Sequence, residues 1–227
     1  MFSANSVISD LIIYILFAVA FFIELYYLKT QDKNHFLIAV GFIVIGSWIT
    51  FVNYSNFTII PYFTIAMTLS IIGDAFMAKK LQLTGERIID GILAFAAAHI
   101  AYIYAFKQTT LDSYSLWYVV PSAIALLALY FLVLYNPQAK PELRIGSFVY
   151  TLVIIALFVT VLRFVLTDHV PINAIVVSLL GVSLFILSDS LIAFNEFKKE
   201  LPHAEKFISF TYILAQILLQ TTPLLLL

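Results

Sequence analysis

Residues 57–78 read FTIIPYFTIAMTLSIIGDAFMA, an apolar run that holds one acidic residue, Asp74, close to its end. A helix needs roughly 20 apolar residues to cross the hydrocarbon core of a bilayer, and this run is long enough. A carboxylate is costly in hydrocarbon, so it usually faces a bundle interior or a wet cavity. The segment therefore predicts a membrane-spanning helix that keeps one polar side chain inside the protein.

Seven further apolar stretches surround this segment and are separated by short polar connections. We predict an all-α fold, a polytopic membrane bundle of about eight transmembrane helices that forms a single membrane domain over residues 1–227. The predicted spans are residues 8–28, 36–52, 57–78, 88–106, 115–135, 145–166, 172–194 and 207–226.

Composition supports the same fold class. The chain is 63% hydrophobic and 11% charged, whereas soluble proteins have roughly 45–50% apolar and about 25% charged residues. A net charge of −1 provides no field that would attract nucleic acid, so the expected partners are lipids. The absence of cysteine excludes disulfides, thiolate catalysis and metals held by cysteine.

The distribution of basic residues predicts the orientation in the membrane. Lysine and arginine accumulate in cytoplasmic loops. Ten of the 12 basic residues fall in or beside the first, third, fifth and seventh loops, and only Lys107 and Arg163 lie on the other side. This asymmetry places the odd-numbered loops in the cytoplasm and both termini outside.

The two halves of the sequence resemble each other. IGDAFMA at residues 72–78 matches LSDSLIA at residues 187–193, and Ala98-His99-Ile100 matches Ala215-Gln216-Ile217. Because the matching segments lie four helices apart, the similarity suggests two parallel four-helix repeats, residues 1–110 and 111–227, related by an axis along the membrane normal.

Asp74 and Asp189 are the leading candidates for chemistry. Each is expected about four or five residues from the cytoplasmic end of its helix, so both lie at one depth. Snorkelling to the interface, or pairing with a lysine such as Lys79, is the alternative for either residue alone. Two carboxylates in one apolar site do not ionise together readily, so the pair can supply a general acid beside an anionic partner.

Other polar residues are expected deeper in the bundle. His99 and Tyr102 lie one turn apart in the fourth predicted span. Tyr212, Gln216 and Gln220 follow at intervals of four in the last span, and hydrogen bonding between helices is the simpler expectation for Gln220.

Motifs of other enzyme classes are absent from the sequence. It contains no G-x-S-x-G elbow, P-loop, H-E-x-x-H motif or histidine pair at metal-ligand spacing. Acid and base chemistry by carboxylates, assisted by His99, is the enzymatic chemistry that remains.

Several short motifs together resemble the lysoplasmalogenase family, also called YhhN-like proteins. The motifs follow one another in order over most of the chain. They are Gly73-Asp74, Ala98-His99 with Tyr102, Gly181 through Leu184-Phe185, Ser188-Asp189, Leu191-Ile192-Ala193, and Tyr212 with Ala215-Gln216.

This resemblance implies hydrolysis of the vinyl ether bond of lysoplasmalogens, which releases a fatty aldehyde and glycerophosphoethanolamine or glycerophosphocholine. Asp74 and Asp189 would be catalytic, without a metal or other cofactor. The expected partners are the lysophospholipid substrate and bilayer lipids, and the expected location is the inner membrane of a bacterium. His99, Tyr102, Ser188, Tyr212 and Gln216 would support the pair.

The headgroup of the substrate is expected at the cytoplasmic interface. Lys79 and Lys80 are the candidates to meet its phosphate. Glu24, near the end of the first predicted span, joins them as a candidate for headgroup binding, although an ordinary interfacial charge is the simpler explanation for this residue.

A proton-coupled transporter of small molecules or lipids is the alternative function, because parallel repeats and intramembrane acids also occur in carriers. The spans contain few of the glycine and proline interruptions that carriers use. An intramembrane aspartyl protease is disfavoured, since residues 71–74 read IIGD and lack the first glycine of G-x-G-D.

Overall fold

The computed structural model describes residues 4–110 and 116–227, and all regular structure in these two ranges is helical. The long helices are α1 (Ala4–Thr30), α2 (Lys33–Tyr54), α3 (Ile60–Met77), α4 (Arg87–Lys107), α5 (Leu116–Leu129), α6 (Pro141–Val165), α7 (Ile172–Phe197) and α8 (Ala204–Thr221). Two short helical turns, η1 (Tyr130–Leu134) and η2 (Pro223–Leu225), continue α5 and follow α8.

The prediction of an all-α polytopic membrane protein is confirmed. Within the described residues, eight helices are long and apolar enough to cross a membrane, with η1 completing the span that α5 begins. Ser115, where the fifth span was expected to start, lies outside the described residues. The last span runs to Leu225, close to the predicted end, although its regular α-helix ends at Thr221 because Pro223 cannot continue the hydrogen bonding and a 3-10 turn completes it.

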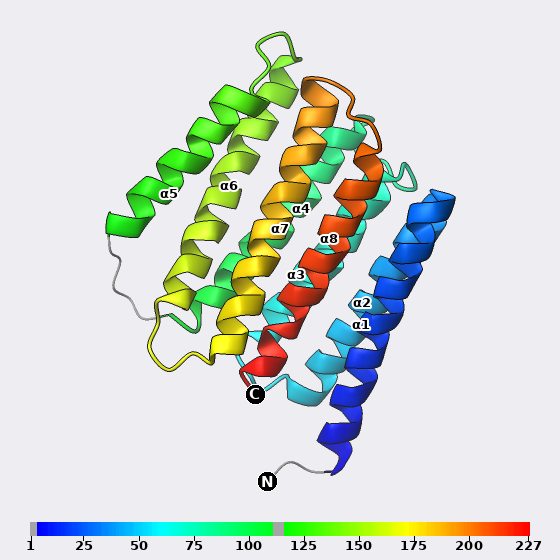
Figure 1. Ribbon diagram of the computed structural model, residues 1–227, viewed down its shortest axis with the longest axis vertical. Coiled ribbons are helices and arrows are strands. Elements are labelled where there is room, and N and C mark those ends of the chain that lie inside the picture. The colour runs from blue at the N-terminus through cyan, green and yellow to red at the C-terminus, as the bar shows by residue number, and fades with distance from the viewer. Residues whose placement is uncertain (1–3, 111–115) are drawn as a thin grey trace.

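Successive helices run in alternating directions and pack side by side into one bundle (Figure 1). The start of α1 and the C-terminus lie at one end, and the turns that join α1 to α2, α3 to α4, α5 to α6 and α7 to α8 lie at the opposite end. We call this opposite end the basic end because ten of the 12 basic residues lie in or beside these turns. The side of the membrane that this end faces, and the relation between the two halves, remain predictions.

Neighbouring helices pack most closely as the pairs α1 with α2, α3 with α4, and α7 with α8. In addition, α4 packs against α6, and α8 packs against α1 and α2, which joins the two halves of the chain. Helix α5 lies at one edge of the bundle, where its main helical neighbour is α6 (Figure 1).

Two glycines allow close helix packing, one of them beside Asp74. A Cβ atom at Gly73 would lie 2.9 Å from the Phe95 ring, and one at Gly181 would lie 2.9 Å from Leu219 Cγ. Small residues let helices approach closely inside a membrane. Gly73 therefore permits the approach of α3 to α4 directly beside Asp74.

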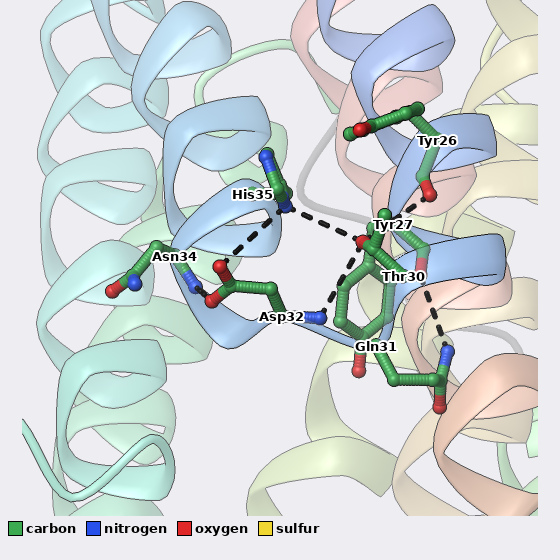
Figure 2. A network of polar contacts seen from close by, with 7 residues as sticks. All are labelled: Tyr26, Tyr27, Thr30, Gln31, Asp32, Asn34 and His35. Carbon is green, nitrogen blue, oxygen red and sulfur yellow. Dashed lines mark hydrogen bonds and ion pairs between the residues drawn. The ribbon is translucent and has the colours of Figure 1, made fainter.

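The turn between α1 and α2 is held by polar contacts at the basic end (Figure 2). The Asp32 side chain caps α2 by accepting from the Asn34 backbone N–H at 2.9 Å, which satisfies a donor that the first turn of a helix leaves free. Thr30 Oγ1 lies 3.3 Å from His35 Nδ1, and Gln31 adopts a left-handed backbone conformation with φ of 55°. These contacts fix the start of α2, and hence the position of Lys33.

Candidate active site

A polar cavity of about 340 Å³ enters the bundle from its basic end. Helices α1, α2, α3, α4, α7 and α8 contribute to its lining, which includes both candidate aspartates. Asp74 comes from α3 and Asp189 from α7, at corresponding places in the two halves of the sequence. The structure thus brings together two carboxylates that are 115 residues apart in the chain.

Each carboxylate accepts a hydrogen bond from a tyrosine of another helix. Tyr212 Oη of α8 donates to Asp74 Oδ2 at 2.7 Å, and Tyr150 Oη of α6 donates to Asp189 Oδ2 at 2.6 Å. Asp74 is 4% exposed, and the side chain of Asp189 is 9% exposed. Because buried carboxylates are costly without donors, the tyrosines stabilise the two aspartates at the cavity.

His99 belongs to the Asp189 side of the site. Its Nε2 lies 3.6 Å from Asp189 Oδ2 and 3.4 Å from Tyr150 Oη. Its ring meets Phe185 edge-on, with 4.6 Å between ring centroids, so the imidazole is held in place by α7. Asp189, Tyr150 and His99 therefore form one cluster contributed by α7, α6 and α4.

Tyr102 and the two glutamines form a separate polar layer. Tyr102 Oη donates to Gln216 Oε1 at 2.8 Å and accepts from Gln220 Nε2 at 2.9 Å. Gln220 Nε2 also donates to the Phe63 carbonyl oxygen of α3 at 3.1 Å, so the expectation that Gln220 joins helices is confirmed. None of these three side chains lines the polar cavity, and the layer connects to the site through α8, where Gln216 lies one turn from Tyr212.

Charged residues surround the outer part of the cavity. Arg87 Nη2 of α4 lies 2.6 Å from Glu196 Oε1 of α7, and Lys33 Nζ of α2 lies 3.9 Å from Glu205 Oε1 of α8. Lys79 also lines the cavity and follows Ala78, the C-cap residue of α3, with φ of 60°. The outer cavity therefore combines three cations and two carboxylates within reach of solvent.

The remaining predicted residues lie in different surroundings. Ser188 lines the cavity, and its hydroxyl donates to the Ile208 carbonyl oxygen at 3.1 Å. Lys80 is exposed and is not among the described lining residues, although it directly follows Lys79. Glu24 is fully buried in α1 and is likewise absent from that lining.

The sequence did not identify Tyr150 or Arg87 as parts of this site, and for Glu196, expected at the same end of the bundle, an ordinary interfacial charge was the simpler expectation. Tyr150 lies nine residues into α6, where an aromatic residue in an apolar run normally indicates packing. The sequence did offer one signal, because the predicted spans place this tyrosine at the same depth in the membrane as Asp189. Arg87 and Glu196 are 109 residues apart, and only the fold brings them together.

The arrangement suits proton transfer in a partly wet site. Two carboxylates at one cavity can act as acid and base, and tyrosine and histidine side chains hold them in position. The charged outer part suits a ligand with a phosphate, because cations bind phosphate oxygens directly. The described residues therefore place groups suited to acid–base chemistry next to cations suited to an anionic ligand.

Comparison with known proteins gives two matches. The model of the YhhN family matches residues 49–222. A pig (Sus scrofa) protein named lysoplasmalogenase TMEM86B is 32% identical over 155 residues, which is 68% of this chain and 59% of the pig protein. The match thus spans less than two thirds of that relative's length. No solved structure matches the chain.

Tyr102 offers a test of the separate polar layer. Tyr102→Phe leaves the buried amides of Gln216 and Gln220 without their hydroxyl partner, and we expect a loss of about 1–3 kcal/mol in the free energy of unfolding. Thermal unfolding in detergent measures the change. The control is Tyr104→Phe on the same helix, where the side chain is 53% exposed. Equal unfolding temperatures for the two variants would contradict a stabilising layer.

Proposed function

Because this chain belongs to the YhhN family, we propose that it is a membrane hydrolase that cleaves the vinyl ether bond of lysoplasmalogens. The products are a fatty aldehyde and glycerophosphoethanolamine or glycerophosphocholine. The name of the pig relative, a lysoplasmalogenase, supports this substrate class. The motifs that resemble the family include both aspartates of the cavity.

The observation that carries the proposal is the pair of carboxylates, Asp74 and Asp189, at one cavity. Vinyl ethers hydrolyse when an acid protonates the alkene carbon farther from oxygen, which leaves an oxocarbenium ion. A protonated carboxyl can supply that proton, and a carboxylate can stabilise the cation and orient water. Paired carboxylates serve glycosidases in a comparable way.

The reaction balances with these two groups alone. The alkene π electrons take a proton from one carboxyl, and the cation forms at the carbon bonded to oxygen. Water attacks that carbon to form a hemiacetal and gives its proton to the other carboxylate. The C–O bond then breaks, the departing oxygen takes back that proton, and the hemiacetal hydroxyl returns its proton to the first carboxylate. Both aspartates end in their starting states.

We further propose that the substrate enters from the cytoplasmic leaflet of a bacterial inner membrane, with both termini of the protein outside. Its phosphate meets Lys79 at the outer cavity, next to the Arg87–Glu196 ion pair. His99 and Tyr150 hold Asp189, and Tyr212 holds Asp74. Tyr102 and Gln216 keep Tyr212 in place through α8.

The central test replaces each carboxylate by its amide. Asp74→Asn and Asp189→Asn remove one proton-transfer group each, and we expect each to lower kcat by roughly 10²–10⁴-fold. Aldehyde release from a lysoplasmenyl lipid by the purified protein in detergent measures the rate.

Saturated-ether and acyl lysolipids of equal chain length serve as controls, and unfolding temperatures establish that the variants fold. Near-normal rates in either folded variant would refute the carboxylate mechanism. If the wild-type protein released no aldehyde from lysoplasmenyl lipids with any of the headgroups tested, the hydrolase proposal would fail and transport would become the leading function.

Lys79 and Lys80 form a matched pair for testing headgroup recognition. Lys79→Ala removes a cation from the cavity, so we expect KM to rise about three- to tenfold with little change in kcat, as for the loss of a partly exposed charge contact. Lys80→Ala, one residue later and outside the lining, should leave both constants unchanged. Equal effects of the two substitutions would exclude a specific contact with Lys79.

A further inference from the structure

A second pocket lies beside the polar cavity, and most of its exposed lining is apolar, although Asp189 and Glu196 also reach it. Helices α4, α5, α6 and α7 form most of it, together with Met77 from α3 and the turn η1. Its free volume is about 90 Å³, so it has little room for a bulky polar group. Such a space suits a slender apolar group better than a headgroup.

The pocket runs along the basic half of the bundle. Its lining on α7 extends from Ile186 to Phe197, or about 16 Å at about 1.5 Å per residue. Leu126 and Ile154 lie deepest on α5 and α6, so they close the end toward the middle of the membrane. A lipid chain in the leaflet at this end would point in the same direction.

The two cavities are neighbours and share a wall at Asp189. Five residues line both cavities, and Asp189 is the one of the two aspartates among them. The other four are Met77, Phe95, Ile192 and Glu196. Asp74 lines only the polar cavity. A molecule with a polar end and an apolar chain could therefore occupy both cavities, with its junction beside Asp189.

The outer wall of the apolar pocket suits entry from the bilayer. Leu126 and Leu129 of α5, with Tyr130 and Leu134 of η1, provide this wall. Helix α5 lies at the edge of the bundle and packs mainly on α6 (Figure 1). Ile124 of α5 and Leu132 of η1 are 61% and 82% exposed. One thin layer of protein thus separates the pocket from the surrounding membrane.

We propose that this pocket binds the alkenyl chain of the lysoplasmalogen, and that its junction with the polar cavity orients the vinyl ether. The inference rests on the proposed hydrolase function. With the chain in the apolar pocket, the alkene carbon on the chain side lies beside Asp189, and the carbon bonded to oxygen faces Asp74 and the water of the polar cavity.

This orientation assigns the two carboxylates their roles. The proton must go to the carbon on the chain side, so Asp189 is the donor. Tyr150 and His99 both contact Oδ2 of Asp189, which leaves Oδ1 to carry the proton toward the substrate. Asp74 stabilises the cation at the neighbouring carbon and accepts the proton of the attacking water.

The chain site is tested by filling its deep end. Ile154→Trp shortens the pocket, whereas Leu152→Trp changes an outward-facing residue of the same helix that is 45% exposed and does not line it. For short alkenyl chains, we expect Ile154→Trp to keep the kcat/KM of the wild-type protein. For longer chains, its kcat/KM should fall below the wild-type value by about fourfold for each methylene that the shortened pocket no longer admits. Leu152→Trp should follow the wild-type dependence on chain length.

A binding measurement separates this proposal from the catalytic one. A saturated-ether lysolipid with a photoreactive group at the end of its chain should crosslink to peptides containing Leu126 or Ile154 in Asp189→Asn, whether or not the wild-type protein hydrolyses anything. Excess lysoplasmenyl lipid should suppress the crosslink. Crosslinks at other places in the protein would overturn the proposed chain site. Crosslinks at the pocket that excess substrate does not suppress would overturn it as well, because they would indicate that a bilayer lipid or detergent occupies the pocket.

Deuterium exchange tests the roles of the two carboxylates. In D₂O, Asp74→Asn retains the donor but captures water poorly, so the cation can return a proton to Asp189. Unreacted substrate should then gain deuterium at the alkene carbon on the chain side. Asp189→Asn should show no exchange. Exchange in Asp189→Asn, or its absence from Asp74→Asn, would overturn the assignment of Asp189 as donor.

Discussion

The cost of placing a carboxylate inside an apolar bundle constrains the rest of this structure. Asp74 and Asp189 remain buried because each accepts a short hydrogen bond from a tyrosine on a different helix. The Tyr212 bond links α3 to α8, and the Tyr150 bond links α7 to α6. Helix packing and the candidate site therefore depend on the same contacts, and the glycine beside Asp74 allows α4 to pack closely there.

Much of this site could be predicted from the sequence, because the underlying costs are large. Runs of about 20 apolar residues determine the spans, and the basic residues divide clearly between the two ends. A carboxylate in such a run is too costly to be incidental, so Asp74 and Asp189 could be identified directly. His99 stands out for the same reason.

The partners of these residues could not be predicted in the same way. Tyr150 is amphipathic and fits an apolar run without penalty, so only the packing of α6 against α4 and α7 identifies it as a donor. The spacing of Tyr102 and His99 suggested one shared face, but the two side chains lie in different polar groups, since His99 contacts α6 and α7 whereas Tyr102 contacts α8. The position of each helix in the bundle decides which partner a polar residue meets.

The meeting of a wet and a dry cavity suits the difficulty of the proposed reaction. Protonating carbon requires an acid that is not levelled by bulk water, whereas capture of the cation requires one water molecule. Met77, Phe95 and Ile192 are apolar residues that line both cavities, as Asp189 does. Asp189 thus lines both cavities and Asp74 lines only the polar one. This division can keep proton donation and water capture apart, although they occur at adjacent carbon atoms.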